Sequence, residues 1–215
     1  MQALQLSRTF EEKENSMRSK SISLLLIIRK MSNKLMIHGS MFALLKRFVD
    51  NTFGSDTWEN LQGESLTGVK EYNSHANYPL SEMEAIIAIA SKKMGISEAD
   101  LQENFGEKMV PDLMTAYGKY INPAWKTFEI LEYTEHVMHK AVRKEESNAN
   151  PPILNVCRVH DKLLVIDYYS QRKMACLAVG IIKGIAAYYQ ESDQLKIICN
   201  TDPTDERVQI RLEFE

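Results

Sequence analysis

The chain of 215 residues predicts an α+β fold, with an amino-terminal helical subdomain and a carboxy-terminal antiparallel sheet with helices. Apolar residues recur at helical spacing up to about residue 144, whereas four later segments are rich in Val, Ile, Leu and Tyr. One further helical pattern lies between the two pairs of strands. Helices first and then hairpin, helix and hairpin are typical of an α+β domain rather than of alternating βαβ units.

The first predicted helix has a single apolar stripe and ends at Gly54. The stripe consists of Met41, Leu44, Leu45, Phe48 and Val49. A short helix follows Asp56, which suits an N-cap. The next helix is expected to start at Ser81, with Glu84 completing a capping box, and to end at Gly95.

Two shorter helices and one long helix complete the helical part. Ser97 opens a helix that is expected to reach Gly106, and Pro111 then starts a separate helix that runs to about Tyr117. The long helix follows Pro123 and runs over residues 125–144.

The four predicted strands form two hairpins on either side of a helix over residues 173–190. They cover residues 153–160, 162–169, 194–199 and 207–213. In the last strand apolar and charged residues alternate, which predicts one buried face made of Val208, Ile210, Leu212 and Phe214.

Residues 1–35 differ from the rest of the chain. They carry seven basic residues and three glutamates (net +4), so the other 180 residues carry −7. The apolar run over residues 22–28 is too short to span a membrane and lacks a small-residue cleavage site. We expect a disordered extension; a targeting signal, or a natural start at Met31 or Met36, are the alternatives. Residues 36–215 are expected to form the domain.

Composition excludes several function classes. The net charge of −3 does not favour nucleic-acid binding, and no stable membrane insertion is expected. The cysteines Cys157, Cys176 and Cys199 form no disulfide framework, which favours a reducing, cytoplasmic location. Nucleotide-binding, hydrolase and metalloprotease motifs are absent, so the sequence does not support an enzyme.

Two polar groupings stand out. His136 and His139 share roughly one face of the long helix and could be ordinary helix residues, zinc ligands or, for one of them, a haem ligand. On a strand, Tyr168, Ser170 and Arg172 would alternate onto one face, where they suit a ligand with carboxylates. A solvated strand end is the alternative.

Together these features resemble the H-NOX (haem-nitric oxide/oxygen binding) family, which includes the haem domain of soluble guanylate cyclase. The match covers roughly residues 36–215. It also includes His38-Gly39, the turn Gly54-Ser-Asp-Thr-Trp58 and the pair Pro151-Pro152. The resemblance implies that haem b lies between the two parts of the fold and that Tyr168, Ser170 and Arg172 bind its propionates.

The resemblance also implies roles for other residues. The family's iron ligand precedes the matching proline by thirteen residues, which selects His139 relative to Pro152. His136 has the wrong spacing. Met138 and Val142 are expected to flank the ligand. The apolar wall of the haem slot is expected to include Met41, Leu44, Leu45, Met109, Leu113 and Leu177.

The implied function is a haem-based gas sensor and not an enzyme. Leu177 occupies the position at which O2-binding members carry a tyrosine, so NO and CO binding with O2 excluded is expected. No output domain is expected after Glu215, and the expected partner is a histidine kinase or cyclic-dinucleotide enzyme in trans. The alternatives are a haem-free interaction module, a sensor fragment of a guanylate cyclase, or a small haem oxidase.

Overall fold

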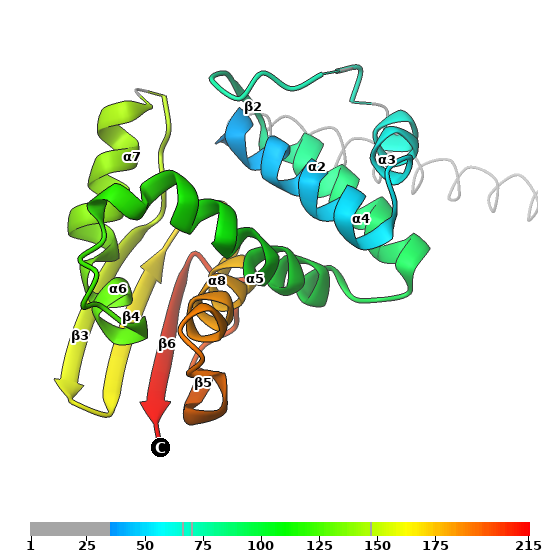
Figure 1. Ribbon diagram of the computed structural model, residues 1–215. Helices are drawn as coiled ribbons and strands as arrows, with labels where there is room; N and C mark the ends of the chain where they lie inside the picture. Colours follow the sequence, from blue (N-terminus) through cyan, green and yellow to red (C-terminus); the bar gives the residue numbers. More distant parts are fainter. Residues whose placement is uncertain (1–34, 66, 70, 147) are drawn as a thin grey trace, which may run out of the picture.

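The computed structural model describes residues 35–215 except positions 66, 70 and 147. Two groups of elements lie towards opposite ends of one long helix, α5 (Glu98–Tyr117) (Figure 1). The predicted α+β class is confirmed. The expectations for residues 1–34 lie outside the described residues. In the part that is described, no helix combines the length and the apolarity needed to cross a bilayer.

The amino-terminal group consists of three helices and a two-stranded antiparallel ribbon. These are β1 (Met36–His38), α2 (Gly39–Phe53), α3 (Thr57–Ser65), β2 (Asn77–Pro79) and α4 (Leu80–Met94). The ribbon was not predicted, because three-residue strands are too short for a period-two pattern. Helix α4 begins at Leu80, with Pro79 at the N-cap, so the prediction of Ser81 as the cap was wrong. Pro79 has a ψ of 134°, which is extended, and the Leu80 amide donates to the carbonyl of Leu35 at 2.8 Å, so the helix begins after Pro79.

The carboxy-terminal group is a four-stranded antiparallel sheet with helices. Its elements are α6 (Thr127–Tyr133), the π-helical turn η2 (Thr134–His139), α7 (Lys140–Glu145), β3 (Ile153–His160), β4 (Leu163–Tyr169), α8 (Ala175–Tyr188), β5 (Leu195–Cys199) and β6 (Arg207–Phe214). Short 3-10 turns lie at Gly118–Tyr120 and Ser192–Gln194. The strand order is β3-β4-β6-β5.

The register of β4 and β6 builds one buried face of the sheet. The pairs Leu164–Leu212, Ile166–Ile210 and Tyr168–Val208 lie opposite each other, and all six residues are buried. This confirms the alternation predicted for the last strand, although Phe214 is only half-buried. The same core includes Phe128 of α6 and Val179 and Ile182 of α8.

Helix α5 runs without a break through Pro111, so the prediction of two helices there was wrong. Proline has no N–H to give to the carbonyl of Glu107, and a proline inside a helix costs about 3 kcal/mol. Burial offsets that cost, because Met109 and Val110 are buried before the proline and Leu113 packs against the amino-terminal core after it.

Helices α5 and α8 touch through their backbones. A Cβ on Gly106 would collide with the carbonyl of Leu177, and one on Gly180 with the carbonyl of Glu103. These glycines therefore permit an approach that no other residue allows. Since α5 and α8 contribute to both cores, this contact joins the two groups of elements.

Candidate functional site

His139 lies at the end of the π-helical turn η2, between α6 and α7. The predicted helix over residues 125–144 is found as helical backbone from 127 to 145, with this turn in its middle. At the start of the turn the Thr134 hydroxyl donates to the carbonyl of Ile130 at 2.7 Å, a bond that competes with the helical pattern. Turns of this type are frequent at functional sites.

The His139 imidazole is sheltered and held on one side. Its side chain is 15% exposed, and its Nδ1 lies 2.9 Å from Oε2 of Glu135. Burial lowers the pKa of His139, although the Glu135 carboxylate and the backbone of Pro152 act in the opposite direction. The imidazole is therefore favoured in its neutral form, which is the form that binds metals.

The other residues predicted near His139 differ in their exposure to solvent. The backbone of Pro152 acts to raise the pKa of the imidazole, against the effect of burial. Met138 and Val142, predicted to flank the ligand, are half-buried on the same helical segment. His136 is exposed, which fits an ordinary helix residue.

The segment Tyr168–Arg172 leaves the sheet earlier than predicted. Strand β4 ends at Tyr169, so Ser170 and Arg172 do not share a strand face with Tyr168. The backbone amide of Ser170 still donates to the backbone carbonyl of Glu206 at 2.8 Å. The chain then turns, and the Lys173 amide donates to the Ser170 carbonyl at 3.1 Å. The Ser170 hydroxyl also accepts from the Arg172 amide at 3.2 Å, so a turn holds these residues together instead of a strand.

Arg172 bridges the two groups of elements. Its Nη1 donates to the carbonyl of Met36 at 3.1 Å, and its Nη2 donates to the carbonyl of Asn150, just before Pro151-Pro152. Burial lowers the pKa of Arg172. Within the described part of the chain no carboxylate pairs with this guanidinium, so it is a half-buried cation with only neutral partners.

Tyr168 completes this polar set. Its side chain is buried, and burial raises the pKa of its phenol, although Ser170 and Arg172 act in the opposite direction. The phenol is therefore neutral and can donate a hydrogen bond. A phenol, a hydroxyl and an unpaired guanidinium fit the carboxylates of a haem, because they can donate to several oxygens at once.

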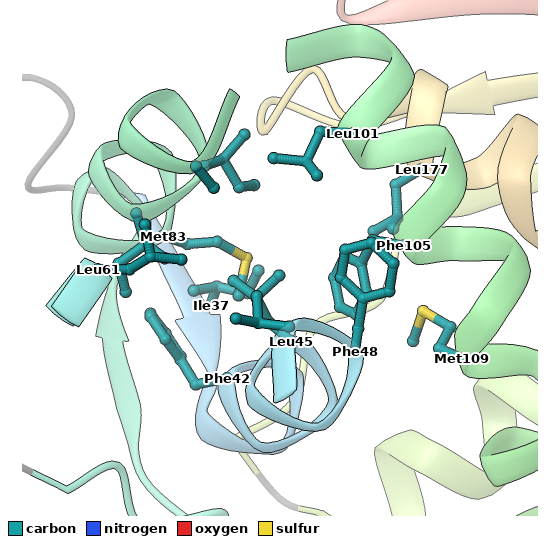
Figure 2. Close-up of a cluster of buried hydrophobic side chains, with 14 of the residues drawn as sticks. Ile37, Phe42, Leu45, Phe48, Leu61, Met83, Leu101, Phe105, Met109 and Leu177 are labelled. Carbon is teal, nitrogen blue, oxygen red and sulfur yellow. The ribbon is translucent and has the colours of Figure 1, made fainter. Parts of the chain in front are cut away.

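The predicted apolar wall lies in the amino-terminal core. Figure 2 shows Leu45, Met109 and Leu177 within one cluster, together with Phe48 and Phe105. Leu45, Met109 and Leu177 are buried, whereas Met41, Leu44 and Leu113 are half-buried and pack against the cluster. The predicted residues therefore form an apolar set here and a polar set that consists of His139, Tyr168, Ser170 and Arg172. The apolar residues Pro152, Met138 and Val142 belong with His139.

Two small cavities lie outside the polar set. One of about 140 Å³ lies between α2 and α5 and is lined by Leu44, Arg47, Phe48, Asn51, Lys108, Met109 and Asp112. The other, of about 180 Å³, is lined by Lys126, Phe128, Glu129, Arg158, Asp161, Glu191 and Phe214 and contains no predicted site residue. Only the first cavity is lined by residues of the predicted apolar wall, Leu44 and Met109. Both cavities are smaller than typical pockets for larger ligands, which measure about 300–1,000 Å³.

The sequence did not predict the polar contacts by which residues shortly before Pro152 join the two groups of elements. Oε2 of Glu146 lies 3.5 Å from His38 Nε2 and 3.2 Å from His75 Nδ1. The side-chain amide of Asn77 donates to the carbonyl of Asn148 at 3.0 Å. No local pattern signals such contacts. Glu135, in contrast, stands four residues before His139 on a predicted helix, a spacing that places side chains together.

Comparison with known proteins identifies the family. The model of the haem-NO-binding family (HNOB) matches residues 38–197. An H-NOX protein from S. oneidensis in the Fe(II)NO state is 19% identical, with 83% of this chain and 99% of that chain covered and a TM-score of 0.74. The Fe(II) unliganded H-NOX protein from K. algicida is 21% identical, with 83% and 97% covered and a TM-score of 0.74.

A third structure, an H-NOX domain from Shewanella oneidensis in the Fe(II)CO state, is 19% identical, with 83% and 99% covered and a TM-score of 0.71. At these identities the likeness shows the fold, and a comparison with curated proteins found no match. The family model, in contrast, spans well over half of the chain. The protein therefore belongs to the haem-NO-binding (H-NOX) family.

Proposed function

We propose that this protein is a haem-based gas sensor that binds NO and CO at ferrous haem, excludes O2 and passes a conformational signal to a separate protein. The observation that carries the proposal is the sheltered His139, favoured in its neutral form, with Nδ1 held by Glu135. When bound, haem b would supply a ferrous iron that can take up a diatomic gas.

The chain's own residues fit this cofactor. With Nδ1 of His139 donating to Glu135, the ring presents Nε2 as the nitrogen for iron. Arg172 is a half-buried cation that no carboxylate neutralises within the described residues. We therefore assign the propionates to Arg172, Tyr168 and Ser170. Pro152 and the half-buried Met138 and Val142 would lie against the haem on the histidine side.

The apolar character of the amino-terminal core supports selection against O2. Leu177 is only 7% exposed and belongs to a cluster of apolar side chains. Two tyrosines border this cluster. The hydroxyl hydrogen of Tyr72 is engaged, because it donates to Glu82 at 2.9 Å, whereas the Tyr78 hydroxyl accepts from the Asn73 amide at 2.8 Å and keeps its own hydrogen. Bound O2 depends on a hydrogen-bond donor for its stability, whereas NO binds ferrous haem without one.

The contacts between the two groups suggest how a signal would travel. The segment after α7 contacts the β1–β2 ribbon through Glu146, which lies beside His38, and through the carbonyl of Asn148, which accepts from Asn77. Arg172 contacts both this segment and the ribbon. A shift of His139 would therefore reach the amino-terminal group. A partner responds only if it binds the shifted and unshifted states with different affinities.

We infer that the sensor comprises residues 36–215 and that its partner is a histidine kinase or a cyclic-dinucleotide enzyme in trans. The three cysteines are free thiols, which supports a reducing and therefore cytoplasmic setting. The polar groups of the proposed site serve anchoring and do not form an acid–base or nucleophile arrangement, so we propose sensing and not catalysis.

The absorption spectrum of the purified protein tests the proposal. The ferrous protein should show a Soret band that shifts with NO and with CO, and exposure to air should give no change or slow oxidation. A colourless protein that takes up no added haem would favour a haem-free interaction module. A stable oxygenated spectrum in air would contradict the exclusion of O2.

A further inference from the structure

The Glu135 carboxylate makes three contacts, each to a different part of the carboxy-terminal group. Its Oε2 lies 2.9 Å from Nδ1 of His139 and accepts from the backbone N–H of Leu154 at 3.0 Å. Its other oxygen, Oε1, accepts from Nη1 of Arg143 at 2.8 Å. Because an ionised carboxylate can only accept, Nδ1 of His139 is the donor.

These contacts are sheltered from solvent. The side chains of Glu135 and His139 are 17% and 15% exposed, so water screens their interaction less than at an open surface. A glutamate is ordinarily ionised at neutral pH, and hydrogen bonds from His139, Leu154 and Arg143 favour that form here. The carboxylate is thus ionised at neutral pH and has three donors around it.

The Leu154 contact connects Glu135, and through it His139, to strand β3. Leu154 is the second residue of β3 and stands two residues after Pro152. The same oxygen that holds the His139 ring also holds the amide at the start of this edge strand. A movement of His139 would therefore act directly on the strand through one carboxylate, in addition to any path along the helix.

We propose that Glu135 is a positioning residue that sets the orientation and basicity of His139 and couples it to the start of β3. The proposal rests on the proposed function of His139 as the iron ligand. A carboxylate on the second nitrogen of a ligating histidine fixes its tautomer and strengthens it as a ligand, and loss of such a partner typically lowers metal affinity by about 10- to 100-fold.

The test compares Glu135→Gln with Glu132→Gln in the haem-loaded protein. Both variants remove one negative charge from the same helical segment, but Glu132 pairs with Arg158, at 3.2 Å, and not with His139. Glu135→Gln should release haem to an apomyoglobin acceptor about 10-fold faster and lower the Fe–His stretching frequency in resonance Raman spectra. Glu132→Gln should match the wild type in both.

A second measurement follows the coupling in the haem-free protein. Hydrogen exchange of the Leu154 amide should be faster in Glu135→Gln than in Glu132→Gln. If Glu135→Gln does not fold, Glu135→Asp, which keeps the charge but shortens the reach, provides the same three readouts. Equal haem release and an equal Fe–His frequency in the Glu135 and Glu132 variants would overturn the proposal. A wild-type protein that takes up no haem would instead overturn the proposed function.

Discussion

The two sets of predicted haem contacts differ in how they are built. The polar set consists of His139, Tyr168, Ser170 and Arg172, and hydrogen bonds orient His139 and Arg172. In the amino-terminal core the predicted wall includes Leu45, Met109 and Leu177, which are buried among other apolar side chains. The first set depends on direction, because hydrogen bonds weaken steeply when misaligned, whereas apolar packing is non-directional.

This difference separates two properties of the proposed sensor. The polar set should decide whether haem is held and how its iron is ligated. The apolar set should decide the stability of the amino-terminal group and which gas is accepted. Substitutions in one set should therefore leave the property of the other set largely intact, and four predictions test this separation.

The largest effect is expected for His139→Gly. Removal of the imidazole should abolish the ferrous haem spectrum, and added imidazole should restore it because the small ligand can occupy the space left behind. Absorption spectra with and without imidazole measure this. His136→Gly is the matched control, since His136 is exposed on the same turn and should leave the spectrum intact. An unchanged spectrum in His139→Gly would show that a residue other than His139 binds the haem iron.

Leu45→Ala tests the apolar set. Leu45 is 1% exposed, and truncation of such a leucine typically costs about 2–5 kcal/mol of unfolding free energy. Urea unfolding should show that loss, while the Soret band of the loaded protein keeps its position. Lys46→Ala, at an exposed site next to it, should change stability by less than about 1 kcal/mol. A displaced Soret band in Leu45→Ala would break the separation of the two sets.

Arg172→Ala should reduce haem retention by roughly 10- to 100-fold, because a hydrogen bond to a charged group contributes about 1.5–3 kcal/mol. Arg172→Lys should fall in between, since an ammonium cannot form the bidentate contact of a guanidinium. Haem transfer to apomyoglobin measures both. Lys173→Gln, an exposed neighbour, is the control. Equal haem retention in Arg172→Ala and Lys173→Gln would show that the propionates do not bind at Arg172.

The smallest effect concerns the stability of the haem-free protein in acid. The pKa of His139 is lowered in the folded state, so below the ordinary histidine value of about 6.5 the unfolded chain binds protons first and folding weakens. The lowered pKa of Glu135 adds stability above its ordinary value, which is lost as the pH falls through the folded-state value.

Urea unfolding at about pH 7 and about pH 5.5 reports the first of these contributions. The wild type should lose stability over this interval, and His139→Gln should lose less, because it has no imidazole to protonate. An equal loss in both proteins would show that burial of His139 does not govern this dependence.

The larger elements of the fold could be predicted from the sequence because each has a local cause. Apolar spacing predicted α2 and the buried face of β6, and glycines predicted the ends of α2 and α4. The errors arose where distant packing outweighed local preference. Helix α5 continues through Pro111 because residues on both sides of the proline are buried against other elements.

The candidate site shows the same division. The residue types in the segments around His139 and Arg172 could be identified from the sequence, and a resemblance to a known family assigned them roles. The contact of Glu135 with the Leu154 amide and the bridge from Arg172 to Met36 could not, because they join positions 19 and 136 residues apart. Loop closure over such separations depends on the whole fold and leaves no local pattern.

By itself the sequence determined the helix-then-sheet architecture, the apolar character of the amino-terminal core and the presence of a histidine and an arginine suited to haem. Only the tertiary structure decided that His139 is sheltered and favoured in its neutral form, that a turn holds Ser170 and Arg172, and that Arg172 spans both groups. The reason is that periodicity and residue type act locally, whereas burial, pKa and hydrogen-bond partners depend on which distant segments fold against one another.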